Sequence, residues 1–226
     1  LAPILGKFMI RMSFKLPRKI GVAVSGGCDS MAALDFLRRS NEVTALHFNH
    51  CTPNSNEASK LVHNFCKEKG IDYVCQYLRE QCPKGASLED FWRKERYRFF
   101  SEFNGCFPIV TCHHLDDVAE TWIFTALNGN PMLIPSRREI YLRPFLQTRK
   151  AVFEDWCDRK NVPYVFDPSN DDISYMRNYI RHELVPKVSI VNPGLAKVLR
   201  KKVLNNLPNC FNINEINGNI EHELQL

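Results

Sequence analysis

Short apolar runs alternate with amphipathic segments from about residue 19 of this chain. Ile20 to Val24 predicts a first strand, and Ser30 to Arg39 predicts the helix that follows it. The alternation continues, with strands expected over 43–48, 71–78 and 107–112 and helices over 54–70, 87–103 and from about 115 to 128. Strand, crossover helix and parallel strand in repetition predict an α/β fold, a doubly wound, mainly parallel sheet with helices on both faces.

Capping patterns indicate where two of these helices begin. Asn54 and Glu57 have the spacing of a capping box, and Gly70 is expected to end that helix. Ser87 has Asp90 three residues on and predicts the start of the next helix.

The pattern changes in the second half of the chain. Residues 130–138 are polar and contain proline, which is typical of a loop. A helix is expected from near Thr148 to Lys160, and residues 162–167 predict a short extended piece. Beyond Pro186 the pattern weakens into an Asn-rich tail with one basic amphipathic stretch at 197–204. We therefore expect a catalytic domain over 1–186 and a short helical C-terminal extension over 187–226.

Composition excludes several classes of protein. A hydrophobic content of 44% and a charged content of 24% argue against a disordered or fibrous chain. The nine cysteines contain no Cys-x-x-Cys pair, which disfavours a zinc ribbon, a redox dithiol and a disulfide framework. With no apolar run near the ~18 residues of a membrane helix and no signal-peptide pattern, we expect a cytoplasmic protein. The net charge of +5 permits a polyanionic partner without requiring one.

One glycine-containing turn lies between the first strand and its helix, and its residues are Ser25, Gly26, Gly27, Cys28, Asp29 and Ser30. Glycines let a ligand approach the backbone, and successive N–H groups at a helix N-terminus bind phosphate oxygens. The string is neither G-x-x-x-x-G-K-[ST] nor G-x-G-x-x-G. Asp29 beside phosphates implies a magnesium ion if the ligand is ATP. The alternative is an ordinary turn in which Asp29 or Ser30 caps the helix.

A second polar cluster follows the strand expected over 107–112. His113 and His114 leave this strand, and Asp116, Asp117 and Glu120 fall on the first turns of the next helix. Because the carboxyl ends of parallel strands share one edge of the sheet, this cluster faces the same edge as the glycine turn. His113, His114, Asp116 and Asp117 are either metal ligands or helix caps and ordinary hydrogen-bonding groups.

Two helices carry basic residues at positions suited to anions. Arg93 and Arg96 lie on the helix that begins at Ser87, where Arg96 is one turn from Trp92 and Phe100 and so lies close to the apolar side. Arg177 and Arg181 are one turn apart on a helix that follows the turn around Asn170. A guanidinium in either place has three possible environments. It binds a phosphate, it extends around the edge of the core with its charged end in water, or it lies on a solvated surface.

Several strings occur in the order that is typical of one family. S-G-G-x-D-S, S-x-E-x-x-x-R-x-x-R-Y-x-F-F, H-H-x-x-D-x-x-E-T, R-P-F-L-x-x-R and D-P-S-N-x-D-x-x-x-x-R-N-x-I-R span about residues 20–186. The chain therefore resembles the tRNA(Ile)-lysidine synthetases, which belong to the PP-loop, or N-type, ATP pyrophosphatases. The resemblance implies a ligase that uses ATP and Mg to adenylate the C2 oxygen of the wobble cytidine in an isoleucine tRNA with a CAU anticodon. Free L-lysine then displaces AMP through its ε-amine.

The resemblance also implies roles for single residues. Residues 25–30 would hold the pyrophosphate, and Asp29 would help to hold magnesium. His113 and Asp117 would lie beside the cytidine and the incoming lysine. Arg93 and Arg96 would neutralise charge on the phosphates. The remaining three, Asn170, Arg177 and Arg181, would close the site or meet the tRNA backbone.

Three other functions stay open at this stage. A PP-loop tRNA thiolation enzyme needs a persulfide cysteine, and a metal-dependent phosphoesterase would use His113, His114, Asp116 and Asp117. A nucleotide-binding or RNA-binding module would keep the loop as a scaffold. Many members of the family carry further C-terminal domains, so we expect either a short form that reads mainly the anticodon region or a truncated chain. The oligomeric state is open, with a homodimer among the options.

Overall fold

A parallel sheet forms the centre of the protein in this computed structural model, which describes residues 9–207. Its six strands within that range have the order β3-β2-β1-β4-β6-β5. The parallel strands are β1 (Lys19–Ala23), β2 (Glu42–Asn49), β3 (Asp72–Tyr77), β4 (Ile109–Val110) and β6 (Tyr141–Leu142), while β5 (Arg137–Arg138) runs antiparallel to β6. The chain builds outward from β1 in both directions, so the topological switch point lies between β1 and β4.

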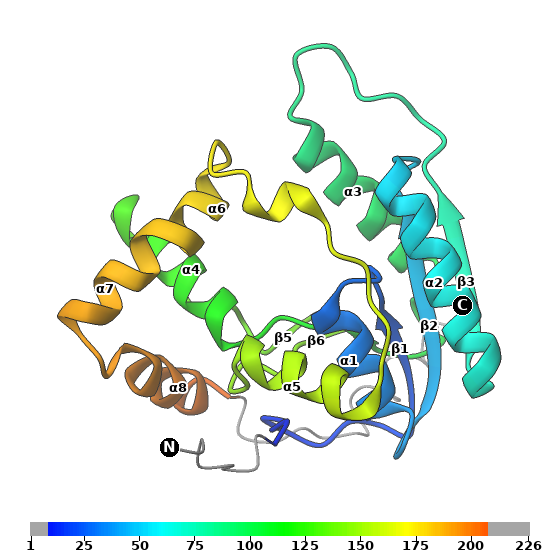
Figure 1. Cartoon of the computed structure of the whole chain (residues 1–226), viewed down its shortest axis with the longest axis horizontal. Coiled ribbons are helices and arrows are strands. Elements are labelled where there is room, and N and C mark those ends of the chain that lie inside the picture. Colours follow the sequence, from blue (N-terminus) through cyan, green and yellow to red (C-terminus); the bar gives the residue numbers. More distant parts are fainter. Residues whose placement is uncertain (1–8, 208–226) are drawn as a thin grey trace.

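Helices cover both faces of this sheet (Figure 1). They are α1 (Cys28–Leu37), α2 (Pro53–Lys69), α3 (Leu88–Ser101), α4 (Leu115–Leu127), α5 (Lys150–Lys160), α6 (Met176–Tyr179), α7 (Val185–Val191) and α8 (Leu195–Asn205). A 3-10 turn, η1 (Pro168–Asp171), precedes α6, and a π-helical turn, η2 (Ile180–Leu184), joins α6 to α7. The predicted doubly wound α/β fold with helices on both faces is confirmed.

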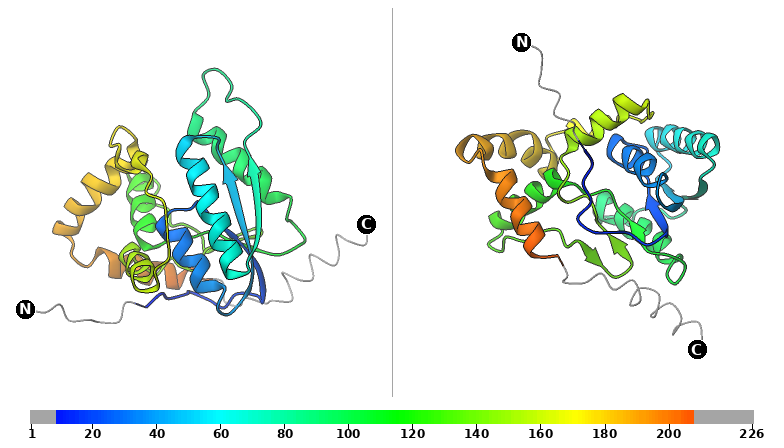
Figure 2. Two further views of the ribbon diagram at one scale, coloured as in Figure 1. Left: turned by 45° about the vertical axis from the view of Figure 1, so that its right-hand side comes forward. Right: turned by 90° about the horizontal axis from the view of Figure 1, so that it is seen from below.

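Two apolar clusters sandwich the central strands. On one face Ile20 and Val22 of β1 are fully buried against α1, α2 and α5, which contributes Phe153. On the other face Leu46 of β2 packs with Phe99 of α3. Figure 2 shows α3 on the opposite side of the sheet from α1 and α2. Burial on both faces holds the carboxyl edge of β1 in one place, and the glycine turn begins at that edge.

Three local features differ from the sequence-based expectations. α2 begins at Pro53, because the Thr52 hydroxyl accepts a hydrogen bond from the Ser55 amide at 3.2 Å, so the predicted Asn54 cap is wrong by two residues. The loop expected over 130–138 contains β5. Residues 162–167 form no strand, although the Val165 amide donates to the Gly26 carbonyl at 2.9 Å.

The C-terminal extension packs on the rest of the protein through α8. Its buried residues Leu195, Leu199 and Val203 contact Leu115 and Val118 of α4. The basic stretch 197–204 therefore presents an apolar face to α4. The boundary expected at 186 falls inside α7 and stays a prediction, and most of the Asn-rich tail lies outside the described residues. No helix within residues 9–207 is long and apolar enough to span a membrane.

Gly26 is the position where the turn after β1 depends on glycine. Its φ is +90°, and a Cβ atom there would lie 2.7 Å from Ala58 Cβ of α2. Gly85 has a similar φ of +82° with nothing within 4 Å, so it is a matched control for backbone strain alone. We expect Gly26→Ala to lower the free energy of unfolding by about 1–3 kcal/mol more than Gly85→Ala, because it adds overpacking to the same strain. Urea unfolding of both variants measures this difference, and equal losses would show that α2 yields to the added methyl group.

Candidate functional site

The turn Ser25–Ser30 at the end of β1 is held in shape by the Ser30 side chain. Ser30 Oγ accepts from the Ser25 amide at 3.1 Å and donates to the Gly27 carbonyl at 2.9 Å. The Gly27 amide in turn donates to Ser25 Oγ at 3.3 Å. Gly27 is the N-cap residue of α1 and no side chain caps this helix, so the alternative in which Asp29 or Ser30 caps the helix is wrong.

The first amides of α1 remain available for a ligand. The N–H groups of Cys28, Asp29 and Ser30 have no hydrogen-bond partner among the described residues. These orphan donors carry the positive end of the helix dipole. A phosphate group is therefore the ligand that fits the turn.

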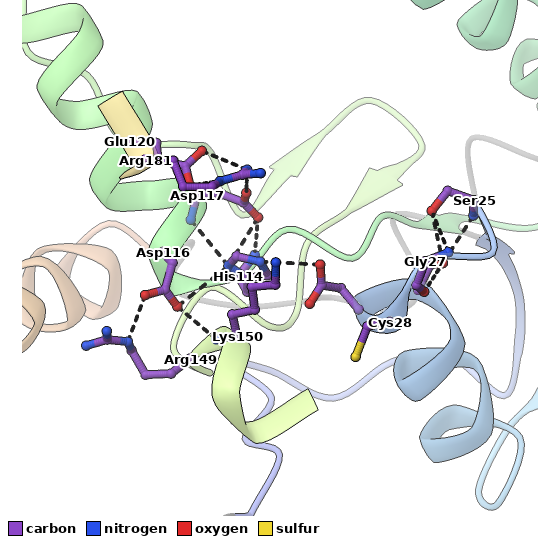
Figure 3. Close-up of polar contacts among 12 residues, drawn as sticks. Ser25, Gly27, Cys28, His114, Asp116, Asp117, Glu120, Arg149, Lys150 and Arg181 are labelled. Carbon is purple, nitrogen blue, oxygen red and sulfur yellow. Dashed lines mark hydrogen bonds and ion pairs between the residues drawn. The ribbon is translucent and has the colours of Figure 1, made fainter. Parts of the chain in front are cut away.

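His114 joins this turn to the second polar cluster (Figure 3). Only 2% of its surface is exposed, and its Nε2 atom lies 3.6 Å from Asp29 Oδ2. At the other side of the ring, Nδ1 lies 3.4 Å from Asp117 Oδ2, which accepts a hydrogen bond from the His114 amide at 2.8 Å. His114 is the N-cap residue of α4, so one buried ring connects the starts of α1 and α4 at the switch point between β1 and β4.

Asp116 extends the same connection to α5. Its Oδ2 atom accepts from the Lys150 amide at 2.8 Å, and its Oδ1 atom lies 2.9 Å from Arg149 Nε. Figure 3 shows these groups around the N-terminal end of α5. Three helix N-termini therefore meet at this edge of the sheet.

His114 is positively charged at neutral pH. Burial alone disfavours the charged imidazole, but the carboxylates of Asp117, Asp29 and Asp116 outweigh burial and raise the pKa of His114 to about 9. The Asp117 amide donates to His114 Nδ1 at 3.3 Å, and Nε2 on the other side of the ring faces the Asp29 carboxylate. In return, His114 together with Lys150 and Arg181 lowers the pKa of Asp29 although burial opposes this.

His113 is a neutral residue in a separate environment. Its Nδ1 atom lies 3.0 Å from Thr111 Oγ1, and burial, with help from the charge on Arg143, lowers its pKa to about 4. Adjacent residues of an extended chain point in opposite directions, which separates the two rings. Within residues 9–207, no group of three or more His, Cys, Asp or Glu side chains is placed to hold a metal ion. His114, Asp116 and Asp117 thus form one polar cluster, while His113 is hydrogen-bonded to Thr111.

Glu120 and Arg181 form the strongest ion pair of the site. Arg181 Nε and Nη2 donate to the two carboxylate oxygens of Glu120 at 2.6 and 3.0 Å, and Arg181 Nη2 lies 3.8 Å from Asp117 Oδ1. Burial raises the pKa of Glu120, although the positive charge of Arg181 acts to lower it. This bidentate pair ties the π-helical turn η2 to α4. Arg177 and Asn170 are exposed, and no hydrogen bond or ion pair among the described residues joins their side chains to this cluster.

Arg93 and Arg96 of α3 face different neighbours. Arg96 is half-buried near His50, whose pKa is lowered to about 4 by burial and by the charge on Arg96. No described residue forms an ion pair or a hydrogen bond with the Arg96 side chain. The guanidinium of Arg93 lies over the ring of Tyr97, 5.0 Å from its centre. The role expected for Arg93 and Arg96 at the phosphates stays a prediction.

Sequence reasoning missed three parts of the site. His114 was treated as one of a histidine pair, but it is the group that joins α1 to α4. Glu120 stood in the motif and was not assigned a role, although its spacing from Asp116 already placed it one turn along the same helix. Lys150 enters the site only through the tertiary packing of α5, for which the sequence carries no local signal.

Asp29 is also the residue that fits a divalent cation. Its Oδ1 atom is buried and has no hydrogen-bond partner, while Oδ2 faces His114. Mg²⁺ binds one or two carboxylates and completes its shell with phosphate oxygens and water. One free carboxylate oxygen beside a phosphate-binding turn fits that mode of binding.

The Asp29–His114 contact makes a testable prediction about titration. Asp29→Asn removes a negative charge from Nε2 and lowers the pKa of His114 below about 9, whereas Asp72→Asn, an exposed control on β3, leaves it unchanged. Titration of the histidine ring signals by NMR measures both. Because the pKa is raised above its ordinary 6.5, the stabilisation from His114 is complete below that pH and is lost as the pH rises through about 9. An unaltered pKa in Asp29→Asn would contradict the contact.

Comparison with known proteins places the chain in a family. Residues 5–188 match the family described as PP-loop domain. The tRNA(Ile)-lysidine synthase of Francisella philomiragia subsp. philomiragia is 31% identical over 198 residues, covering 82% of this chain and 49% of that protein. The tRNA(Ile)-lysidine synthase of Thermotoga sp. strain RQ2 is 33% identical over 198 residues, covering 80% and 48%. The chain thus spans about half the length of these curated relatives.

Among solved structures, an NH3-dependent NAD synthetase from Campylobacter jejuni subsp. jejuni aligns with 86% of this chain and 90% of its own, at a TM-score of 0.48 and 12% identity. The family match spans β1, the glycine turn, the His-Asp cluster and η2. This chain belongs to the PP-loop domain family.

Proposed function

We propose that this protein modifies the wobble cytidine of an isoleucine tRNA with a CAU anticodon to lysidine, using ATP and free L-lysine. The observation that carries the proposal is the Asp29–His114 contact. Through this ion pair, the phosphate-binding turn lies directly beside the acidic cluster. Relatives that are 31–33% identical and carry the name tRNA(Ile)-lysidine synthase support it. A reaction that first uses ATP and then a cationic amine at the same cytidine needs both environments side by side.

The first half of the reaction uses the turn. The amides of Cys28, Asp29 and Ser30 bind phosphate oxygens of ATP, and Ser30 keeps the turn in the shape that presents them. Asp29 offers its free Oδ1 atom to magnesium, which when bound neutralises charge on the phosphates. Arg96 and Arg93 add positive charge along the same edge. The cytidine C2 oxygen attacks the α-phosphorus, and the bond to pyrophosphate breaks.

The second half uses the acidic cluster. Lysine arrives as an ammonium ion, and the carboxylate of Asp117 attracts and orients it. Its ε-amine must lose a proton before it attacks C2 of the adenylated cytidine, and Asp117, whose charge acts on the neutral His113, is the carboxylate proposed to accept that proton. AMP leaves with the C2 oxygen. His113 stays neutral at pH 7, so it serves as a hydrogen-bonding group and does not add charge.

Three residues are proposed to meet the tRNA or close the site. Arg181 is fixed by Glu120 on the π-helical turn, a type of distortion that is frequent at functional sites. Arg177 and Asn170 are exposed nearby in sequence and are free to contact the RNA backbone.

The alternatives are less well supported. A phosphoesterase would need His113, His114, Asp116 and Asp117 to converge on one metal ion, but each is committed to a different partner. A thiolation enzyme needs a reactive thiol at the site. The cysteine in the turn, Cys28, has its pKa strongly raised by its hydrogen bond to Cys157 and by burial, so it is a poor nucleophile.

The central experiment measures transfer of lysine to RNA. The protein is incubated with ATP, Mg²⁺, isotopically labelled lysine and unmodified CAU-anticodon tRNA, and the nucleosides are analysed by mass spectrometry. We expect lysine on the wobble cytidine. Asp29→Asn should reduce turnover about 100-fold or more, because it removes the carboxylate proposed to hold magnesium beside the phosphates, and Asp72→Asn should not. A folded, ATP-binding protein that never transfers lysine would falsify the proposal.

A second variant separates the two halves of the reaction. Asp117→Asn keeps the shape of the α4 cap but removes the charge that orients the ammonium ion. We expect pyrophosphate release with tRNA to continue while lysine transfer falls by at least about tenfold. Measurement of both products in one reaction tests this, and a parallel loss of the two would assign Asp117 to the adenylation step.

A further inference from the structure

A buried arginine outside the predicted site lies at the carboxyl end of β6. Arg143 is only 5% exposed, and its Nη1 atom donates to the Pro135 carbonyl at 2.9 Å. Its Nε atom is buried and has no hydrogen-bond partner. No carboxylate among the described residues forms an ion pair with it. Burial of a permanently charged guanidinium with an unpaired N–H donor is costly unless an anion accepts that hydrogen bond and offsets the charge.

The surroundings of Arg143 add positive charge. Arg93 stacks on Tyr97, whose ring centre lies 4.9 Å from that of Tyr141 on β6. Arg138 on β5 is in register with Tyr141, and its one carboxylate neighbour, Glu139, is 3.6 Å away and as exposed as Arg138 itself. Burial lowers the pKa of Arg143, the hydrogen bond with Tyr97 raises it, and the charges on Arg93 and Arg138 lower it. Three guanidinium groups therefore gather around two tyrosine rings.

The position of this cluster separates it from the glycine turn. β4 lies between β1 and β6, so the carboxyl end of β6 is about 10 Å from that of β1 at the usual strand spacing. The Thr111 amide donates to the Leu142 carbonyl at 2.9 Å, which places Arg143 beside the segment that leads to His113. A phosphate bound by the turn is thus two strands away from this cluster.

We propose that Arg143, Arg93 and Arg138 bind a backbone phosphate of the RNA substrate next to the nucleotide that is presented to His113. The inference rests on the proposed function for the identity of the RNA. Guanidinium groups bind phosphate oxygens through paired N–H donors, and such contacts fix the register of a nucleic acid on its protein. In single-stranded loops the bases splay outward, so one fixed phosphate positions one base.

Salt dependence of RNA binding tests this assignment without any turnover. A fluorescently labelled CAU anticodon stem-loop is titrated with protein by anisotropy over a series of KCl concentrations, and ATP binding is measured in parallel. Each lost phosphate contact on a single strand lowers the slope of log K against log [salt] by about 0.7. We expect Arg143→Gln and Arg138→Gln to weaken RNA binding several-fold and to reduce this slope, with ATP affinity unchanged. Arg18→Gln is the matched control, because Arg18 is 86% exposed and precedes β1 at the opposite edge of the sheet.

Two results would overturn the inference. One is an unchanged slope in both Arg138→Gln and a folded Arg143→Gln, and the other is a loss of ATP affinity with RNA binding intact. If Arg143→Gln unfolds, the salt dependence of RNA binding by Arg138→Gln alone tests the inference, because Arg138 is exposed. Because binding is measured apart from lysine transfer, a protein that binds RNA through this cluster but never forms lysidine would refute the proposed function and leave this site standing.

Discussion

A buried imidazolium between two carboxylates is the interaction on which the rest of this site depends. His114 contacts Asp29 on α1 and Asp117 on α4, and it lies at the switch point where the parallel sheet changes direction. The sheet positions Asp29 and His114 next to each other, since β1 leads into the glycine turn and β4 leads into His114. Without the charge on the ring, two carboxylates would face each other beside a phosphate-binding turn with nothing to offset their repulsion. Fixed placement of the phosphate turn relative to the acidic cluster therefore follows from this one contact.

The same edge of the sheet is divided into an acidic and a basic half. Asp117 and Glu120 contact Arg181 of η2, while Arg93 and Arg143 both contact Tyr97. Neutral His113 lies between the halves. A cationic amine and a polyanionic nucleic acid can thus occupy neighbouring positions without competing for the same charged groups. This division is what the proposed two-step reaction requires.

The fold and the two main motifs were predictable, but the contacts between them were not. The glycine turn and the His-Asp cluster are local strings, and the rule that parallel strands end at one edge was enough to bring them together. Arg143 was passed over because its burial depends on the β5–β6 pairing, inside a segment whose proline and polar residues predict a loop. Arg177 and Arg181 are one turn apart by sequence, yet a π-helical turn begins between them, and only Arg181 reaches Glu120.

The charges around the turn explain why a cation belongs there. Arg149 pairs with Asp116 and Arg181 pairs with Glu120, so these two carboxylates contribute little negative electrostatic potential to the site. Asp29 and Asp117 share the positive charge of His114, and Lys150 and Arg181 add positive charge near Asp29. ATP would bring several negative charges to the same place. In the proposed function, magnesium beside Asp29 and then the ammonium group of lysine beside Asp117 would offset those charges.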